Sequence, residues 1–232
     1  RNRRAQLMAQ APAEGVEADC HVGVGKSWLE LIRHVLRKQH DLVIVGTRHM
    51  GAIKGFFVGS TGMKLLRKCP CAVWVTQPRT GRDFDSILIA HDLREVGDLA
   101  MDLGCSMAKL QNAQLHVVHA AEYPEFDYMF PARVSAERKQ SYRSEADKHI
   151  AAQLATADLS GSPKVHFVVE PPELAIMHCI EQNKVDLVVM GTVGRTGVSG
   201  FITGNTAEKL LPQIPCSLLA VKPPGFVCPV AT

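Results

Sequence analysis

The segment Asp41-Leu-Val-Ile-Val-Gly-Thr47 returns later in the chain as Asp186-Leu-Val-Val-Met-Gly-Thr192. The two copies lie 145 residues apart (186 − 41 = 145), and the correspondence continues without a gap to Pro78 and Pro223. Of the 38 residues from 41 to 78, 15 are identical to their partners. A repeat of this length indicates a duplicated unit, in which an apolar strand runs into a glycine-rich loop.

In the second unit, apolar strands alternate with segments of helical spacing. Strands are predicted at 85–90, 114–118, 165–169, 187–190 and 217–221. Continuously apolar strands separated by helices are typical of a parallel sheet with helices on both faces. The sequence therefore predicts an α/β fold of two tandem, doubly wound, five-stranded parallel sheets.

The first unit is shorter than the second. It offers an extended stretch at 18–24, a helix at 29–36 and strands at 42–45 and 72–75. Counterparts of the first two strands of the second unit would lie about sixty residues before Arg1, since the second unit starts near Phe84 and 84 − 145 = −61. We therefore expect this sequence to be part of a longer chain, and the first unit's remaining strands not to form one continuous sheet.

The repeat also predicts the domain organisation. We expect a first domain at 1–80, incomplete at its N-terminus, a second domain at 83–224 and a C-terminal tail at 225–232. The final strands of the two units, 72–75 and 217–221, are the expected contact, because pairing removes an exposed apolar edge. The two units would then form an intramolecular pseudo-dimer, and a further homodimer contact is left open.

Composition excludes several classes of protein. The 232 residues are 46% hydrophobic and 21% charged with a formal net charge of +3, too balanced to favour a nucleic-acid or membrane-surface partner. No apolar run approaches the roughly 20 residues of a membrane helix. The seven cysteines are odd in number and mostly in apolar surroundings, which favours reduced thiols in a cytoplasmic protein. Cys69-Pro70-Cys71 lacks a second pair for a metal site, so we interpret it as the start of a buried strand.

The strongest chemical signal is the glycine-rich loop of the second unit, from Gly191 through Gly194 to Gly204-Asn205. Glycines let the backbone approach an anion, and a following helix N-terminus favours negative charge. The loop can thus be interpreted as a phosphate cradle. Glycine richness alone equally allows a tight crossover.

With its spacing of Gly, two residues, Gly, nine residues and Gly before a small polar residue, this loop resembles the universal stress protein family in its tandem form. The resemblance covers about Phe84 to Pro223 and about Ala18 to Pro78. It implies a sheet of the adenine nucleotide alpha hydrolase-like type. It also implies ATP or a related adenine nucleotide as ligand, with Mg²⁺ as the one metal expected, accompanying ATP.

The resemblance implies particular site residues. Asp92 would contact adenine, Ala120 would line the pocket and Met190 would lie on the ribose side. The full set implied in the second unit is Asp92, Ala120, Met190, Gly191, Gly194, Gly204 and Asn205. Asn205 stands where Ser or Thr is commoner, and its amide could still donate to a phosphate. The first unit offers a weaker counterpart in Gly46, Gly59 and Ser60, because His49 replaces the middle glycine and would exclude a phosphate sterically.

Two other patterns have simpler explanations. Gly25-Lys26-Ser27 resembles the end of a P-loop, but Cys20 occupies the place of its leading glycine. His116 and His119 lie three apart on a strand and would face opposite sides, so we do not expect them to share a metal ion.

The functional hypothesis is a cytoplasmic stress-response protein that binds an adenine nucleotide in its second domain as a sensor or regulator. No nucleophile, base and orienting group stand at a catalytic spacing, so no catalytic residue is predicted, and at most slow ATP hydrolysis. The alternative is an interaction protein that binds no nucleotide, with an apolar small-molecule cavity in the second domain. The aromatic cluster Tyr123, Phe126, Tyr128 and Phe130 would be its lid or simply a loop packed over the sheet.

Overall fold

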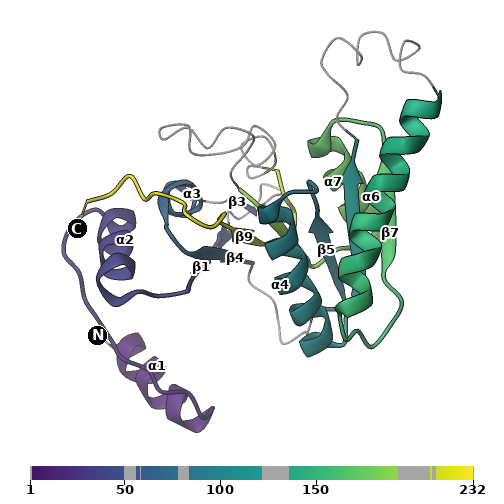
Figure 1. Ribbon diagram of the computed structural model, residues 1–232. Coiled ribbons are helices and arrows are strands. Elements are labelled where there is room, and N and C mark those ends of the chain that lie inside the picture. The colour runs from purple at the N-terminus through teal and green to yellow at the C-terminus, as the bar shows by residue number, and fades with distance from the viewer. Residues whose placement is uncertain are drawn as a thin grey trace.

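The computed structural model describes residues 2–49, 56–57, 59–77, 84–121, 136–192, 210 and 213–231. Seven strands form one mixed sheet, whose order in space is β1 (Leu42–Gly46), β4 (Ala72–Thr76), β9 (Ser217–Val221), β8 (Leu187–Gly191), β5 (Ser86–Ala90), β6 (Gln114–Ala120) and β7 (Lys164–Val168). The helices are α1 (Asn2–Ala13), α2 (Ser27–Lys38), α3 (Ser60–Lys68), α4 (Glu95–Gln111), α6 (Ala136–Thr156) and α7 (Pro172–Asn183) (Figure 1). A small antiparallel pair, β2 (Arg48–His49) and β3 (Phe56–Phe57), completes the described elements.

The second unit has the doubly wound arrangement that the sequence predicts. Its strands β9, β8, β5, β6 and β7 are parallel neighbours in that order. The chain therefore starts in the middle at β5, moves outward to β6 and β7, and returns across β5 to β8 and β9. The direction of winding reverses between β5 and β8. The α/β fold class is confirmed.

The expectation of two separate sheets is wrong. β4 of the first unit pairs antiparallel with β9 of the second, with Val73 opposite Ala220 and Val75 opposite Leu218. β1 pairs parallel with β4, so both first-unit strands extend the second unit's sheet. Their backbone groups find partners across the predicted contact of the final strands, which confirms that contact.

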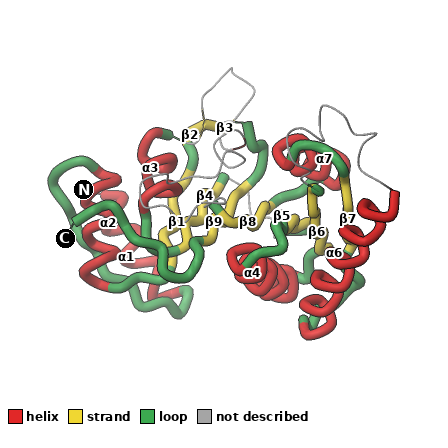
Figure 2. Tube along the Cα trace, turned by 45° about the horizontal axis from the view of Figure 1, so that its top comes forward, coloured by secondary structure: helices red, strands yellow, loops and turns green. Residues whose placement is uncertain are grey.

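Helices cover the sheet on two faces, as the row of strands in Figure 2 shows. On one face α4 and α6 pack on the side chains of Ile87, Ile89, Leu187, Val189 and Leu219. On the other face α2, α3 and α7 pack on Val73, Leu88, Val188 and Leu218. Neighbouring residues of β5 and β8 thus point to opposite cores, so continuous apolar runs were required in these strands.

The described residues cover β1 on one face only. Val43 is buried against the core of α2 and α3, whereas Leu42 and Ile44 are 39% and 58% exposed. The stretch 18–24, expected to be extended like β7, forms no strand, and Val24 is 93% exposed. In the second unit β7 pairs with β6, and no described strand of the first unit occupies the place of β6. A strand without a neighbour cannot satisfy its backbone groups in a sheet.

In the described part of the chain, no helix has both the length and the apolar character needed to span a bilayer. All seven cysteines are free thiols. The residues after β9 return to the first unit, where the Cys228 thiol donates to the Lys68 carbonyl at the end of α3.

Candidate functional site

Four of the predicted site residues gather at the carboxyl edge of the second unit's sheet. Asp92 follows the end of β5, Ala120 ends β6, and Met190 and Gly191 end β8. β5 and β8 are direct neighbours, with Ala90 opposite Met190, and this is the point where the winding reverses. In open α/β sheets, ligands bind outside the carboxyl ends of the strands at such a switch point.

Asp92 is exposed and held in a turn. Its Oδ1 accepts the backbone N–H of Arg94 at 3.2 Å, just before α4 begins at Glu95. A Cβ at Gly97 would lie 2.5 Å from the same oxygen, so the missing side chain lets the carboxylate lie against the first turn of α4. No side chain caps the N-terminus of α4. The backbone N–H groups of the first turn of α4 and the Asp92 carboxylate therefore both lie at the carboxyl edge of the sheet.

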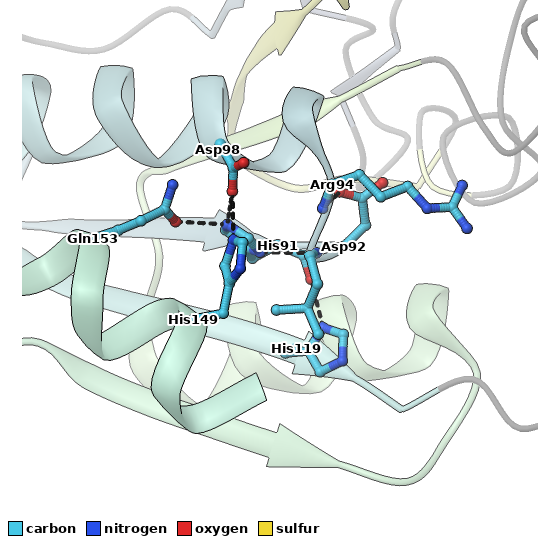
Figure 3. Close-up of polar contacts among 8 residues, drawn as sticks. His91, Asp92, Arg94, Asp98, His119, His149 and Gln153 are labelled. Carbon is cyan, nitrogen blue, oxygen red and sulfur yellow. Dashed lines mark hydrogen bonds and ion pairs between the residues drawn. The ribbon is translucent and has the colours of Figure 1, made fainter. Parts of the chain in front are cut away.

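Histidines at the ends of β5 and β6 support this turn from below (Figure 3). The Leu93 N–H donates to His91 Nδ1 at 2.9 Å, which places the proton of neutral His91 on Nε2. His119 Nδ1 donates to the His91 carbonyl at 2.8 Å, and the Tyr142 hydroxyl donates to His119 Nε2 at 2.9 Å. Burial is the main cause that lowers the pKa of His91.

The end of β8 is closely packed. A Cβ on Gly191 would lie 2.8 Å from the Val96 methyl groups of α4, so a larger residue would push the strand end and the helix apart. The next residue, Thr192, is buried, and its hydroxyl accepts from Lys222 Nζ at 2.8 Å and donates to the Val221 carbonyl at 3.3 Å. Burial lowers the pKa of Lys222 to about 8. Lys222 thus anchors the start of the glycine-rich loop.

The remaining predicted residues of that loop, Gly194, Gly204 and Asn205, lie outside the described residues. So does the aromatic cluster at 123–130. The structure therefore brings together the strand-end part of the predicted site.

In the first unit, Gly46 ends β1, Gly59 precedes α3 and Ser60 is its first residue. His49, which replaces the middle glycine, lies in β2, paired with Phe56 of β3. Residues 48 and 49, which follow β1, thus form one strand of a short antiparallel pair, which the sequence pattern did not indicate.

The two histidines of β6 do have different neighbours, as the strand period predicts. His116 Nδ1 lies 3.1 Å from His166 Nε2 on β7, whereas His119 contacts His91 and Tyr142. Burial, with His166 beside it, lowers the pKa of His116 to about 4. Cys69 and Cys71 lead into β4 as interpreted, with their sulfurs 3.6 Å apart. A hydrogen bond from Cys71 lowers the pKa of Cys69 to about 7.

Sequence reasoning missed one group of polar residues, His91, Asp98 and His149. Asp98 Oδ1 lies 3.3 Å from His91 Nε2 and 2.7 Å from His149 Nε2. The sequence carried one signal, since Asp98 lies in the first turn of a helix that begins three residues after Asp92. The contribution of α6 could not be seen, because His149 lies far away in the chain.

The model of the universal stress protein family matches residues 1–77 and 83–222. The chain belongs to this family. It is of the tandem type. It is 26% identical over 216 residues to Universal stress protein E of Photorhabdus laumondii, covering 86% of this chain and 67% of that protein. It is 28% identical over 215 residues to Universal stress protein E of Escherichia coli K12, covering 86% and 66%.

The chain therefore spans about two thirds of the length of these curated family members. Among solved structures, a functionally unknown protein of Pseudomonas aeruginosa PAO1 is similar with a TM-score of 0.74 and 23% identity, covering 96% of this chain and 77% of that one. At this identity the likeness concerns the fold.

Proposed function

We propose that the second domain, residues 83–224, binds ATP or a related adenine nucleotide at the carboxyl edge of β5, β6 and β8. The observation that carries this proposal is the position of Asp92, Ala120, Met190 and Gly191 around one switch point. Those residues were selected from sequence as the adenine and ribose side of a family site. Their convergence agrees with the general location of ligands in doubly wound sheets.

The local chemistry suits each part of such a ligand. The exposed Asp92 carboxylate can accept a hydrogen bond from an adenine amine. Gly191 presents bare backbone beside the start of the glycine-rich loop, and Gly194, Gly204 and Asn205 would complete the phosphate side. Mg²⁺ would enter with ATP. The first domain, residues 1–80, would bind less well through Gly46, Gly59 and Ser60, because His49 interrupts its pattern.

We infer a sensor in the cytoplasm rather than a catalyst. The histidines next to Asp92 are His91 and His119, and both ring nitrogens of each already have partners. Neither is therefore poised as a general base for an attacking water. The β4–β9 pairing would make the two domains an intramolecular pseudo-dimer, with residues 225–232 as a tail. A homodimer of whole chains would add to that arrangement.

A fluorescent ATP analogue tests the site. Asp92→Ala should weaken binding of the analogue at least about tenfold. The substitution removes the hydrogen bond between the charged Asp92 carboxylate and the adenine amine, which bound nucleotide would shield from water. Asp102→Ala is the matched control, because it removes an exposed carboxylate from α4, the helix that follows Asp92, ten residues farther along the chain. Equal affinity of the two variants would disprove the role of Asp92. Native mass spectrometry separates the alternative, a protein with an apolar ligand, since that protein would carry no nucleotide mass.

A further inference from the structure

Three metal-ligating side chains converge on the flank of the sheet, outside the nucleotide site. His91 directly follows β5, Asp98 lies in the first turn of α4 and His149 lies on α6, as Figure 3 shows. One ligand atom from each lies within 4.8 Å of the other two. Among the residues that the structure describes, this is the one such group of three His, Cys, Asp or Glu side chains.

The distances fit a single small cation. Ligand atoms bound about 2.0–2.1 Å from a tetrahedral Zn²⁺ are roughly 3.3 Å from one another. His91 Nε2 and Asp98 Oδ1 already lie 3.3 Å apart. His149 Nε2 lies 2.7 Å from Asp98 Oδ1, and both side chains are partly exposed, 40% and 36%, so they have room to separate.

The group of three side chains is open to solvent on one side and buried on the other. The His91 side chain is fully buried, whereas Asp98 and His149 face solvent in part. Gln153, one helical turn after His149 on α6, lies with Oε1 3.0 Å from His91 Nε2. Two imidazoles, one carboxylate and a solvent-facing fourth position are the ligand set of an open zinc site.

From this geometry we propose that His91, Asp98 and His149 bind a divalent transition-metal ion, with Zn²⁺ as the best match. Imidazole nitrogen with one carboxylate oxygen suits Zn²⁺ better than Mg²⁺ or Ca²⁺, which prefer oxygen alone. The site is separate from any Mg²⁺ that would accompany ATP.

Binding requires a rearrangement at His91. In the structure the Leu93 N–H donates to His91 Nδ1, so the ring proton sits on Nε2, where the metal needs a lone pair. The single ring proton must therefore move from Nε2 to Nδ1 by exchange with solvent, which leaves the ring neutral and frees the Nε2 lone pair. Leu93 has a φ of 58°, a left-handed conformation that is costly for a side chain of this size.

A half-turn of the Asp92–Leu93 peptide group resolves both difficulties. It brings the Leu93 φ into the ordinary negative range and turns its N–H away from the ring. It also presents the Asp92 carbonyl to Nδ1–H, the hydrogen bond that metal-bound histidines usually make. Metal binding is thereby coupled to the turn that carries Asp92.

Titration of the reduced, nucleotide-free chain with Zn²⁺ tests the site, with Co²⁺ as a spectroscopic substitute. We expect one tight equivalent per chain, weakened more than about tenfold by Asp98→Asn and by His149→Ala. His178→Ala is the control. His178 is an exposed histidine on α7 that contacts Glu170, and its loss should leave zinc binding unchanged. Both test residues are partly exposed, so the variants should fold, which circular dichroism checks.

Bound Co²⁺ should lack the charge-transfer absorption of a cobalt–thiolate bond, which excludes the seven cysteines as its ligands. Zn²⁺ should also shift the Leu93 amide signal in an ¹⁵N spectrum. The proposal fails if no equivalent binds tightly, if the two variants bind like wild type, or if a thiolate band appears. Because the chain is titrated without nucleotide, these outcomes do not depend on the proposed nucleotide site.

Discussion

The strand ends of the two units differ at one pair of equivalent positions. Thr47 and Thr192 correspond, as do Gln77 and Lys222, each pair 145 residues apart. Thr192 Oγ1 binds Lys222 Nζ, whereas the covered Thr47 Oγ1 has no hydrogen-bond partner among the described residues. Lys222 also donates to the Leu66 carbonyl of α3, across the contact between units. The two units thus share their backbone arrangement here but differ in one side chain. Lys222 of the second unit forms a hydrogen bond with the first unit, and Gln77 stands at the equivalent position of the first unit.

The units also differ in burial. Every residue of β9 is buried, and β8 is buried from Leu187 to Met190, whereas β1 alternates and leaves Leu42 and Ile44 exposed. Strands covered on two faces should dominate stability. The first unit should depend on its pairing with β9 and on one layer of helices.

Truncation of one buried and one exposed strand residue gives the sharpest contrast. Leu187→Ala removes a side chain with no exposed area and should lower the free energy of unfolding by about 3 kcal/mol, through lost burial and a cavity. Ile44→Ala, at a side chain that is 58% exposed, should cost less than about 1 kcal/mol. Urea unfolding measures both. Equal losses would contradict the view that β1 contributes through one face.

The Lys222 anchor can be converted to the residue of the other unit. Lys222→Gln should lower the free energy of unfolding by about 1–2 kcal/mol, because Thr192 Oγ1 and the Leu66 carbonyl lose a shared donor. Gln77→Asn, a shortening at the equivalent position of the first unit, is the control and should change stability little. If Lys222→Gln unfolded at the same urea concentration as wild type, the anchoring role would be wrong.

Much of this comparison could be predicted from sequence. Continuous apolar runs located β5, β8 and β9, and the repeat located β1 and β4. The apolar edges of the final strands predicted the contact of β4 with β9. The sequence misled at 18–24, where an apolar stretch resembles a strand but has no described neighbour to pair with. The sequence did not show that this contact joins the strands of both units into one seven-stranded sheet, because the direction and register of backbone pairing leave no pattern in the side chains.

The site was predictable to the same extent. Asp92 and Met190 were named because the family resemblance implied them, and Gly191 because it begins the glycine motif at the end of β8. His91, Asp98 and His149 were missed because their meeting depends on how α4 and α6 pack on the sheet. Packing of helices brings together residues whose separation in sequence carries no signal.

The pair of buried His116 on β6 and half-buried His166 on β7 has no described counterpart in the first unit and should make stability depend on pH. The pKa of His116 is about 4 in the folded chain, against an ordinary value of 6.5. Between these values the unfolded chain binds a proton that the folded chain does not, so stability falls as the pH is lowered from 6.5 to 4. His116→Gln should reduce this fall by about 1 kcal/mol, measured by urea unfolding at several pH values.

An exposed histidine serves as the reference for that measurement. His178→Ala should leave the pH dependence between 4 and 6.5 close to that of wild type, apart from its exposed pair with Glu170. A His116→Gln profile parallel to the wild-type profile would show that the pair is not a source of acid sensitivity.

The smallest change in the free energy of unfolding is expected from surface ion pairs. Measuring it tests whether such pairs stabilise the first unit, which is less buried than the second. Glu30 and Arg33 form a half-buried ion pair on α2 of the first unit, and Arg143 and Asp147 form an exposed one on α6 of the second. Glu30→Gln and Asp147→Asn should each change the free energy of unfolding by less than about 0.5 kcal/mol, because solvent and salt screen such pairs. Thermal unfolding at low and high salt measures both. A loss confined to Glu30→Gln that disappears in high salt would show that surface charge compensates for the single covered face of β1. Two equally small effects would leave burial and the β4–β9 pairing as the support of the first unit.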